Sequence, residues 1–545
     1  MTRLATDIEV EVFHDTLIWP LLLRGAEDIA GIDRFLEAFG AAGWREAEDG
    51  LSVHRDFEYD EIVYFHPFVR DFLFGDGATK VVDRTVRRFV RRDVSQVEVE
   101  IKTGKALGET TFTACLKVER VELWLMRPRI AMLVVEISNR RPEASVAIDR
   151  SDARSRLSLA QVLYLQSQLR NIYPPFFEGD RHGDCPVRVV WKGLPAVGDE
   201  LRPSVEDLST FVRIGAEPPM YAHWRAFFGK GVAPMSSAND RQGEVLCLQQ
   251  LLDHRIPSFS FIGVESPGEI SQDDEDRLPA FDTPDLIYDR DFRSRHRDRL
   301  RYTRFRHWGT SYYSNGTSMA MVTKRGDFQL SLLRHYRRHY LHLAVIAQYQ
   351  HAALLYFADE LADIAKKLAM GEKESPERDC RDKIRSLQHR FLKFRTRSYF
   401  TEVSHQIQGQ ELFAFWLEHL RTHDLFERVS QTNSEVYEAL ENFEMREIAQ
   451  EQTKMSVAQT RMTDIATKVI PWSIALAVVS LFFDWLGGYP DDLRSHPTFT
   501  GKPVWGPWMW LSMAMFLAFS AYCGSASLIE HWRCRTAGNS GSGDS

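Results

Sequence analysis

The sequence predicts an α+β cytoplasmic region, then a long α-helical stalk, then two C-terminal transmembrane helices. Strand and helix patterns alternate over the first ~325 residues, and the stretch from Glu377 to Ile470 has no proline and only one glycine, Gly409. Two apolar runs follow near the C-terminal end. With 545 residues, 44% hydrophobic and 26% charged, the chain is long enough for several globular domains.

The first part of the chain is expected to form two mixed α/β regions, 1–155 and 156–325, joined by a linker near 141–155. Val97, Val99 and Ile101 alternate with glutamates, which is typical of a half-exposed strand. The Asn315-Gly316 pair indicates a hairpin within 310–323. Further strands are expected within 110–138, 187–192 and 258–265, and an amphipathic helix within 156–173.

Residues 326–468 are predicted to form the long-helix stalk. We expect a helix over 328–370, helical structure over 381–430 with a break near Gly409, and a helix restart at the capping box Thr432 to Glu435. From there one helix is predicted to run over 433–486 into the first apolar run. Apolar residues recur every seven positions at Ile448, Met455, Met462 and Val469. Such a helix either packs on its own domain or associates with copies of itself.

The two apolar runs, 469–488 and 507–529, have the ~20 residues needed to cross a bilayer. The first contains one charge, Asp484, and the second contains none. Positive residues flank the runs on the sides away from the 489–506 loop, at Arg461, Lys468, Arg533 and Arg535. This bias predicts a cell (inner) membrane protein with the loop outside and both termini, including the tail 530–545, in the cytoplasm. The alternative is a buried helical hairpin in a soluble domain.

This order of elements over residues 326–535 resembles the CorA metal-ion transporter superfamily. The resemblance implies a homo-oligomer, a pentamer, in a lipid bilayer, with long helices and first spans around a central pore. It also implies Mg²⁺ or another divalent cation as the transported or regulatory ion, and no other cofactor. The family's Gly-Met-Asn motif is absent from 486–492. The residues in its place are the predicted pore mouth: Gly487, Gly488, Tyr489, Asp491 and Asp492. Asp491 and Asp492 alternatively are ordinary loop residues.

The candidate pore-lining residues belong to the helix before the first span and to the span itself. They are Met455, Thr460, Met462, Thr463, Asp464, Thr467 and Asp484. Either the threonine face or the methionine face could point inward. An ionisable residue inside a span is costly, so Asp484 faces a pore, a partner or the interface.

Two charged segments are candidate sites in the cytoplasmic part. An arginine-rich run could bind a small anion such as a nucleotide through Arg293, Arg295, Arg297, Arg299 and Arg301. The alternative is that it neutralises the acidic segment 265–276. His335, His339 and His342 recur at helical spacing, so they could bind a metal, although nearby arginines favour a polar face or an anion site.

The sequence favours some functional classes over others. The net charge of −8 argues against nucleic acid as a partner. No catalytic motif occurs at a diagnostic spacing, so we do not expect an enzyme. The first interpretation is a CorA-like oligomeric channel or transporter for divalent cations, gated by its cytoplasmic domain. The alternative is a membrane-anchored effector that senses a nucleotide or a protein, with a possible role in defence.

Overall fold

The computed structural model divides the chain into two compact units, Met1–Ala439 and Leu440–Ser545. Each unit is described by itself. The structure describes residues 8–24, 29–47, 63–75, 84–127, 129–140, 156–173, 176–178, 181–183, 185–194, 220–229, 233–234, 247–251, 254–369, 376–487, 513 and 515–517.

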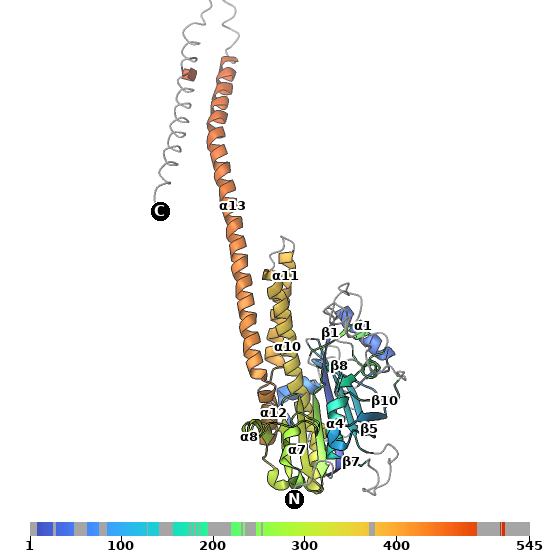
Figure 1. Cartoon of the computed structure of the whole chain (residues 1–545). Helices are drawn as coiled ribbons and strands as arrows, with labels where there is room; N and C mark the ends of the chain where they lie inside the picture. The colour runs from blue at the N-terminus through green and yellow to red at the C-terminus, as the bar shows by residue number, and fades with distance from the viewer. Residues whose placement is uncertain are drawn as a thin grey trace, which may run out of the picture. The chain divides into compact units, whose positions relative to one another are not determined.

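The first unit is built on one large sheet (Figure 1). Strands from both predicted regions, 1–155 and 156–325, belong to it, so the division at 155/156 does not separate two sheets. The linker predicted near 141–155 lies outside the described residues. The main path through the sheet is β10 (Arg188–Lys192), β4 (Gln96–Lys102), β5 (Thr111–Met126), β6 (Ile130–Ser138), β1 (Glu9–Arg24), β13 (Ser258–Val264), β16 (Ser318–Lys324), β15 (Thr310–Ser314) and β14 (Arg301–Tyr302).

The predicted strands are confirmed. In β4 the valines and the isoleucine are buried and the glutamates are partly exposed, as the alternation requires. β15 and β16 form the expected antiparallel hairpin, and Gly316 adopts φ +97° in its turn. β13 pairs antiparallel with β1 and parallel with β16, which brings the first strand beside the last ones.

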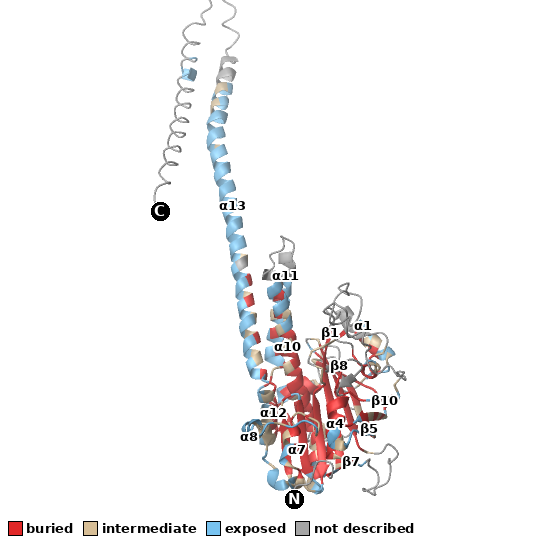
Figure 2. Ribbon diagram, in the orientation of Figure 1, coloured by how far each residue is buried: buried red, intermediate tan, exposed pale blue. Residues whose placement is uncertain are grey.

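Helical segments cover both faces of the sheet. α4 (Leu159–Leu169) begins with a capping box in which Ser158 and Gln161 satisfy each other's backbone N–H groups. Gln166 of α4 donates to Ser260 on one face. On the other face lie α9 (Asp327–His335), the π-helical turn Tyr336–Tyr340 and α10 (Leu341–Ala369), which packs on β1 and β6. Buried residues concentrate in the sheet and in α10 (Figure 2).

The helices after α10 confirm the predicted long-helix region but correct two details. They are α11 (Pro376–Arg397), α12 (Ile407–His419) and α13 (Thr422–Gly487). The break lies at 398–406, and Gly409 is buried inside α12, where a Cβ atom would collide with the Tyr64 hydroxyl. The restart at Thr432 is wrong because α13 is continuous there. The Ser434 hydroxyl donates to the carbonyl of Ser430 one turn earlier, as in a helix interior.

The second unit contains most of α13. This helix is long and apolar enough to cross a membrane, which by itself is weak evidence of a span, and none of its most apolar window is buried. The second predicted span, 507–529, lies outside the described residues except for the helical positions 513 and 515–517. The structure therefore shows a mixed α+β region with a large sheet, followed by long helices and one candidate span.

Candidate functional site

The candidate pore residues from Met455 to Thr467 all lie on α13 and are exposed in the single chain. Met455 and Met462 are 72% and 75% exposed, which is unusual for apolar side chains. The hydroxyl groups of Thr460, Thr463 and Thr467 donate to carbonyls one turn earlier, so their hydrogen-bonding needs are met within the helix. These threonines give the helix a polar face.

The exposed residues form two rows on α13. At about 100° per residue, Thr460 and Thr467 lie about 120–140° around the helix from Met455. Asp464 lies near the threonine row and forms an ion pair with Lys468 at 2.8 Å, so its charge is partly compensated. The helix therefore presents one apolar row and one polar row to whatever surrounds it.

The candidate mouth is only partly placed by the structure. Asp484 belongs to α13, and Gly487 is the last residue of that helix. Gly488, Tyr489, Asp491 and Asp492 lie outside the described residues. Their role at a pore mouth stays a prediction.

The arginine-rich run lies against the acidic segment, as the alternative interpretation expected. Each of three candidate arginines has a carboxylate partner: Arg293 pairs with Asp273, Arg297 with Asp276 at 2.8 Å, and Arg301 with Glu275 at 2.9 Å. Arg299 lies 3.9 Å from Glu418, and the Arg295 Nε donates to the carbonyl of Asp291. The space between the two segments is about 20 Å³, enough for a single water molecule. Anion binding here stays a prediction, and the pairing supports mutual neutralisation.

The three histidines of the predicted metal face do not converge on one point. His335 and His339 lie 2.8 Å apart through their Nδ1 atoms, and the His339 ring stacks on Tyr64. His342 is buried against Arg88, 3.3 Å from a guanidinium nitrogen. Burial and this positive charge lower the pKa of His342 well below its usual value. Among the described residues no group of three possible ligands is arranged for a metal ion.

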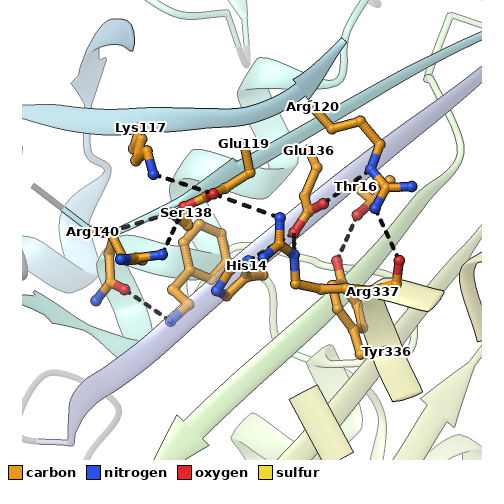
Figure 3. A network of polar contacts seen from close by, with 12 residues as sticks. His14, Thr16, Lys117, Glu119, Arg120, Glu136, Ser138, Arg140, Tyr336 and Arg337 are labelled. Carbon is orange, nitrogen blue, oxygen red and sulfur yellow. Dashed lines mark hydrogen bonds and ion pairs between the residues drawn. The ribbon is translucent and has the colours of Figure 1, made fainter. Parts of the chain in front are cut away.

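A buried network of charges joins the sheet to the π-helical turn (Figure 3). Glu136 on β6 is fully buried at its centre. Its carboxylate accepts hydrogen bonds from Arg337 Nε at 2.6 Å and from His14 Nδ1 at 3.0 Å, and it lies 3.4 Å from Arg120 Nε. Close by, Arg120 donates to the carbonyl of Arg337 at 3.0 Å. Three strands and one helical turn are thus held by one carboxylate.

The electrostatics of this network favour a charged glutamate and a neutral histidine. Burial raises the pKa of Glu136, but Arg337, the hydrogen bond from His14 and Arg120 together hold it well below its usual value. Burial lowers the pKa of His14, and the bond to Glu136 only partly offsets this. A neutral His14 therefore donates its Nδ1–H to the carboxylate.

The π-helical turn explains how the side chains of Tyr336 and Arg337 reach the sheet. One extra residue per turn re-aims the side chains, and such turns are common at functional sites. Tyr336 shares a hydrogen bond with Thr16 at 2.7 Å and donates to the carbonyl of Phe259 at 2.6 Å. This cluster was not predicted from the sequence. The available signal was a charged residue inside an apolar strand, as with Glu136.

Stability is expected to fall below about pH 6.5 because several histidines are buried as neutral rings. His223 is the clearest: burial lowers its pKa to about 3, and neither ring nitrogen has a partner among the residues described. Below about pH 6.5 the ring binds a proton in the unfolded chain but stays neutral in the folded one, so lower pH favours unfolding. This one residue should cost about 2 kcal/mol between pH 7 and pH 5.

Urea unfolding followed by tryptophan fluorescence at both pH values checks this expectation. His223→Phe should remove about 2 kcal/mol of the pH dependence, and His389→Phe, at an exposed position of α11, should keep it. An unchanged pH dependence in His223→Phe would contradict the buried, neutral ring.

Comparisons of the chain with protein-family models, with curated proteins and with solved structures gave no match. The CorA resemblance therefore rests on the order of the elements alone.

Proposed function

We propose that the chain is a CorA-like, homo-oligomeric membrane channel for cations, gated by its large cytoplasmic domain. The observation that carries the proposal is the continuity of α13, one helix from Thr422 to Gly487. Its first turns belong to the unit that contains the sheet, and its last turns are apolar enough to cross a bilayer. One helix thus links residues of the unit that contains the sheet to the candidate span.

The exposed apolar row supports self-association. Ile448, Met455 and Met462 are 52%, 72% and 75% exposed and share one heptad position. An exposed apolar row of this length marks a surface that another molecule covers. A second copy of the same helix presents the same row, so a symmetric assembly satisfies every copy at once. We propose five copies, as the resemblance implies.

The polar row supports ion passage. Hydroxyl and carboxylate oxygens suit hard cations that keep part of their water, and Thr460, Asp464 and Thr467 supply both. In this proposal the 489–506 loop lies outside the cell membrane, both termini lie in the cytoplasm, and Mg²⁺ or another divalent cation passes. The Asp464–Lys468 ion pair would need to open for the full negative charge to face the ion.

Ion flux into sealed vesicles tests the proposal. The full-length protein reconstituted in liposomes is expected to carry Mg²⁺, followed with an enclosed fluorescent indicator. A lysine ring in the pore repels cations, so either Met462→Lys or Thr460→Lys should reduce the flux at least tenfold. Leu392→Lys, at an exposed position of α11, is the matched control and should conduct normally.

The lysine variants are read together with the mass of the oligomer, because a charge on the contact row lowers the flux by dissociating the copies. A lowered flux with an unchanged mass identifies the row that lines the pore. A correctly folded wild-type oligomer that passes no ion would overturn the proposed function. Flux that survives both substitutions would overturn the assignment of α13 to the pore.

A further inference from the structure

A groove of about 650 Å³ opens on the first unit. It lies between α3 (Pro67–Phe74), the residues that lead into β3 (Val86–Val90), and the segment 398–406 that joins α11 to α12. Small-molecule sites typically measure about 300–1,000 Å³, so this groove has the size of a ligand site.

The aromatic wall of the groove is held firmly. The Phe400 ring lies 5.2 Å from Phe72 and 5.7 Å from Phe68, and Phe400 and Phe72 are buried. Phe68 is 53% exposed, so it offers its ring to the groove. Tyr399 stacks on Phe426 at 4.1 Å. A fixed and partly exposed ring is suited to contact with a flat ring of a ligand.

The segment 398–406 is itself fixed to the residues just before α3. The backbone N–H of His66 donates to the carbonyl of Val403 at 3.0 Å, and Phe65 pairs with Ser404 in a short antiparallel bridge. The Ser404 hydroxyl donates to the carbonyl of Tyr64. The groove is therefore formed without a ligand, which lowers the entropic cost of binding.

Two cations and two carboxylates line the groove. Arg84 is half-buried, and its Nε has no hydrogen-bond partner within the described chain. Gly75, at φ +80°, leaves room for this guanidinium, because a Cβ atom there would lie 3.2 Å from Nε. Arg397 is exposed at the end of α11. Asp71 and Glu402 supply negative charge on the same groove.

We propose that this groove binds a small molecule that combines a flat ring, one anionic group and an N–H donor. The ring packs on Phe68, and the carboxylate or phosphate meets the guanidinium forks of Arg84 and Arg397. The N–H donor meets Asp71 or Glu402, since a purely anionic ligand would be repelled by these carboxylates. The Arg84 guanidinium, whose Nε has no hydrogen-bond partner among the described residues, gains an anionic partner in the complex.

The position of the groove suggests what binding would affect. Its lining includes residues 399–402, which lead into α12 and then into α13. A bound ligand therefore stabilises the conformation of residues 399–402 that forms the groove. Ligand binding itself does not depend on the proposed ion conduction, and a binding measurement tests it separately.

Isothermal titration calorimetry of the full chain in nanodiscs tests the site, with 4-aminophenyl phosphate as the probe. This molecule carries the ring, the N–H donor and the anion, and a ligand of its size should bind with a Kd of about 0.1–1 mM. Aniline lacks the anion and inorganic phosphate lacks the ring, so each should bind at least tenfold more weakly.

Matched variants assign the binding to this groove. Arg397→Gln and Arg84→Gln should each weaken binding at least tenfold, because a charge-assisted hydrogen bond is lost. Arg395→Gln, on an exposed neighbour that does not line the groove, should bind normally. Arg397 is exposed, so its substitution keeps the fold. An absence of saturable binding up to about 10 mM, or equal affinity in Arg397→Gln and the wild type, would overturn the proposal.

Discussion

Glu136→Gln is expected to lower the free energy of unfolding of the first unit by about 3–5 kcal/mol, because it removes the closest carboxylate partner of Arg120 and Arg337. Arg337 donates to the Glu136 carboxylate at 2.6 Å and Arg120 lies 3.4 Å from it. Glutamine keeps the shape but removes the negative charge. Urea unfolding at pH 7, followed by tryptophan fluorescence, measures the loss.

A double variant separates the charge effect from a general loss of packing. Glu136→Gln combined with Arg337→Met removes both members of the closest pair, so part of the stability should return. Glu438→Gln, at an exposed position of α13, should change the free energy of unfolding by less than about 0.5 kcal/mol. A loss below about 1 kcal/mol in Glu136→Gln would show that this carboxylate does not hold the network together.

The double substitution Met455→Glu and Met462→Glu is expected to convert the oligomer into monomers. In a symmetric assembly each substitution introduces a ring of like charges into an apolar contact, and buried unpaired charges are strongly unfavourable. The loss of assembly should be close to complete at micromolar concentration. Mass photometry or light scattering in detergent measures the change in mass.

The threonine row provides the control for the assembly. Thr460→Glu and Thr467→Glu place the same charge on the same helix, about 120–140° away from Met455. If this row faces water, the mass of the oligomer should stay the same in that variant. Identical dissociation in both variants would show that the methionine row is not the contact. An unchanged mass in both would show that α13 does not carry the assembly.

Several elements of the fold could be predicted from local patterns, but the central strand β1 was not among them, and the neighbours of each strand in the sheet could not be predicted. The alternation of Val97, Val99 and Ile101 located β4, and Asn315-Gly316 located the hairpin. Nothing local indicates that β1 lies between β6 and β13, because these pairings join residues more than 100 positions apart. The predicted division at 155/156 followed the sequence order, which the sheet does not follow.

The helix breaks show the same limit. A glycine indicates a break when only local propensity is considered, yet Gly409 is required inside α12 because Tyr64 lies against it. The residues from Thr432 to Glu435 match the pattern of a capping box, but they lie inside α13 and do not cap a helix. The candidate pore residues were placed on one helix, as expected, because a long stretch without breakers is a strong local signal.

The candidate groove and the charge network could not be predicted, since each unites distant segments. No sequence pattern indicates that Arg84 and Arg397 lie close together. His14 and Glu136 are separated by 122 positions, and Arg337 by 201 from Glu136. An isolated charge in an apolar strand indicates a buried partner, but the partner is known only from the fold.

The late partners of β1 and β6 have a consequence for synthesis on the ribosome. Glu136 emerges 201 residues before Arg337, which at about 5–20 residues per second corresponds to about 10–40 s. During that interval the carboxylate and the β1–β6 pair lack the π-helical turn that later covers them. The nascent sheet therefore stays partly assembled, with apolar strands uncovered, until residues near 340 have been synthesised. A chaperone that binds exposed strands would have its greatest effect in this interval.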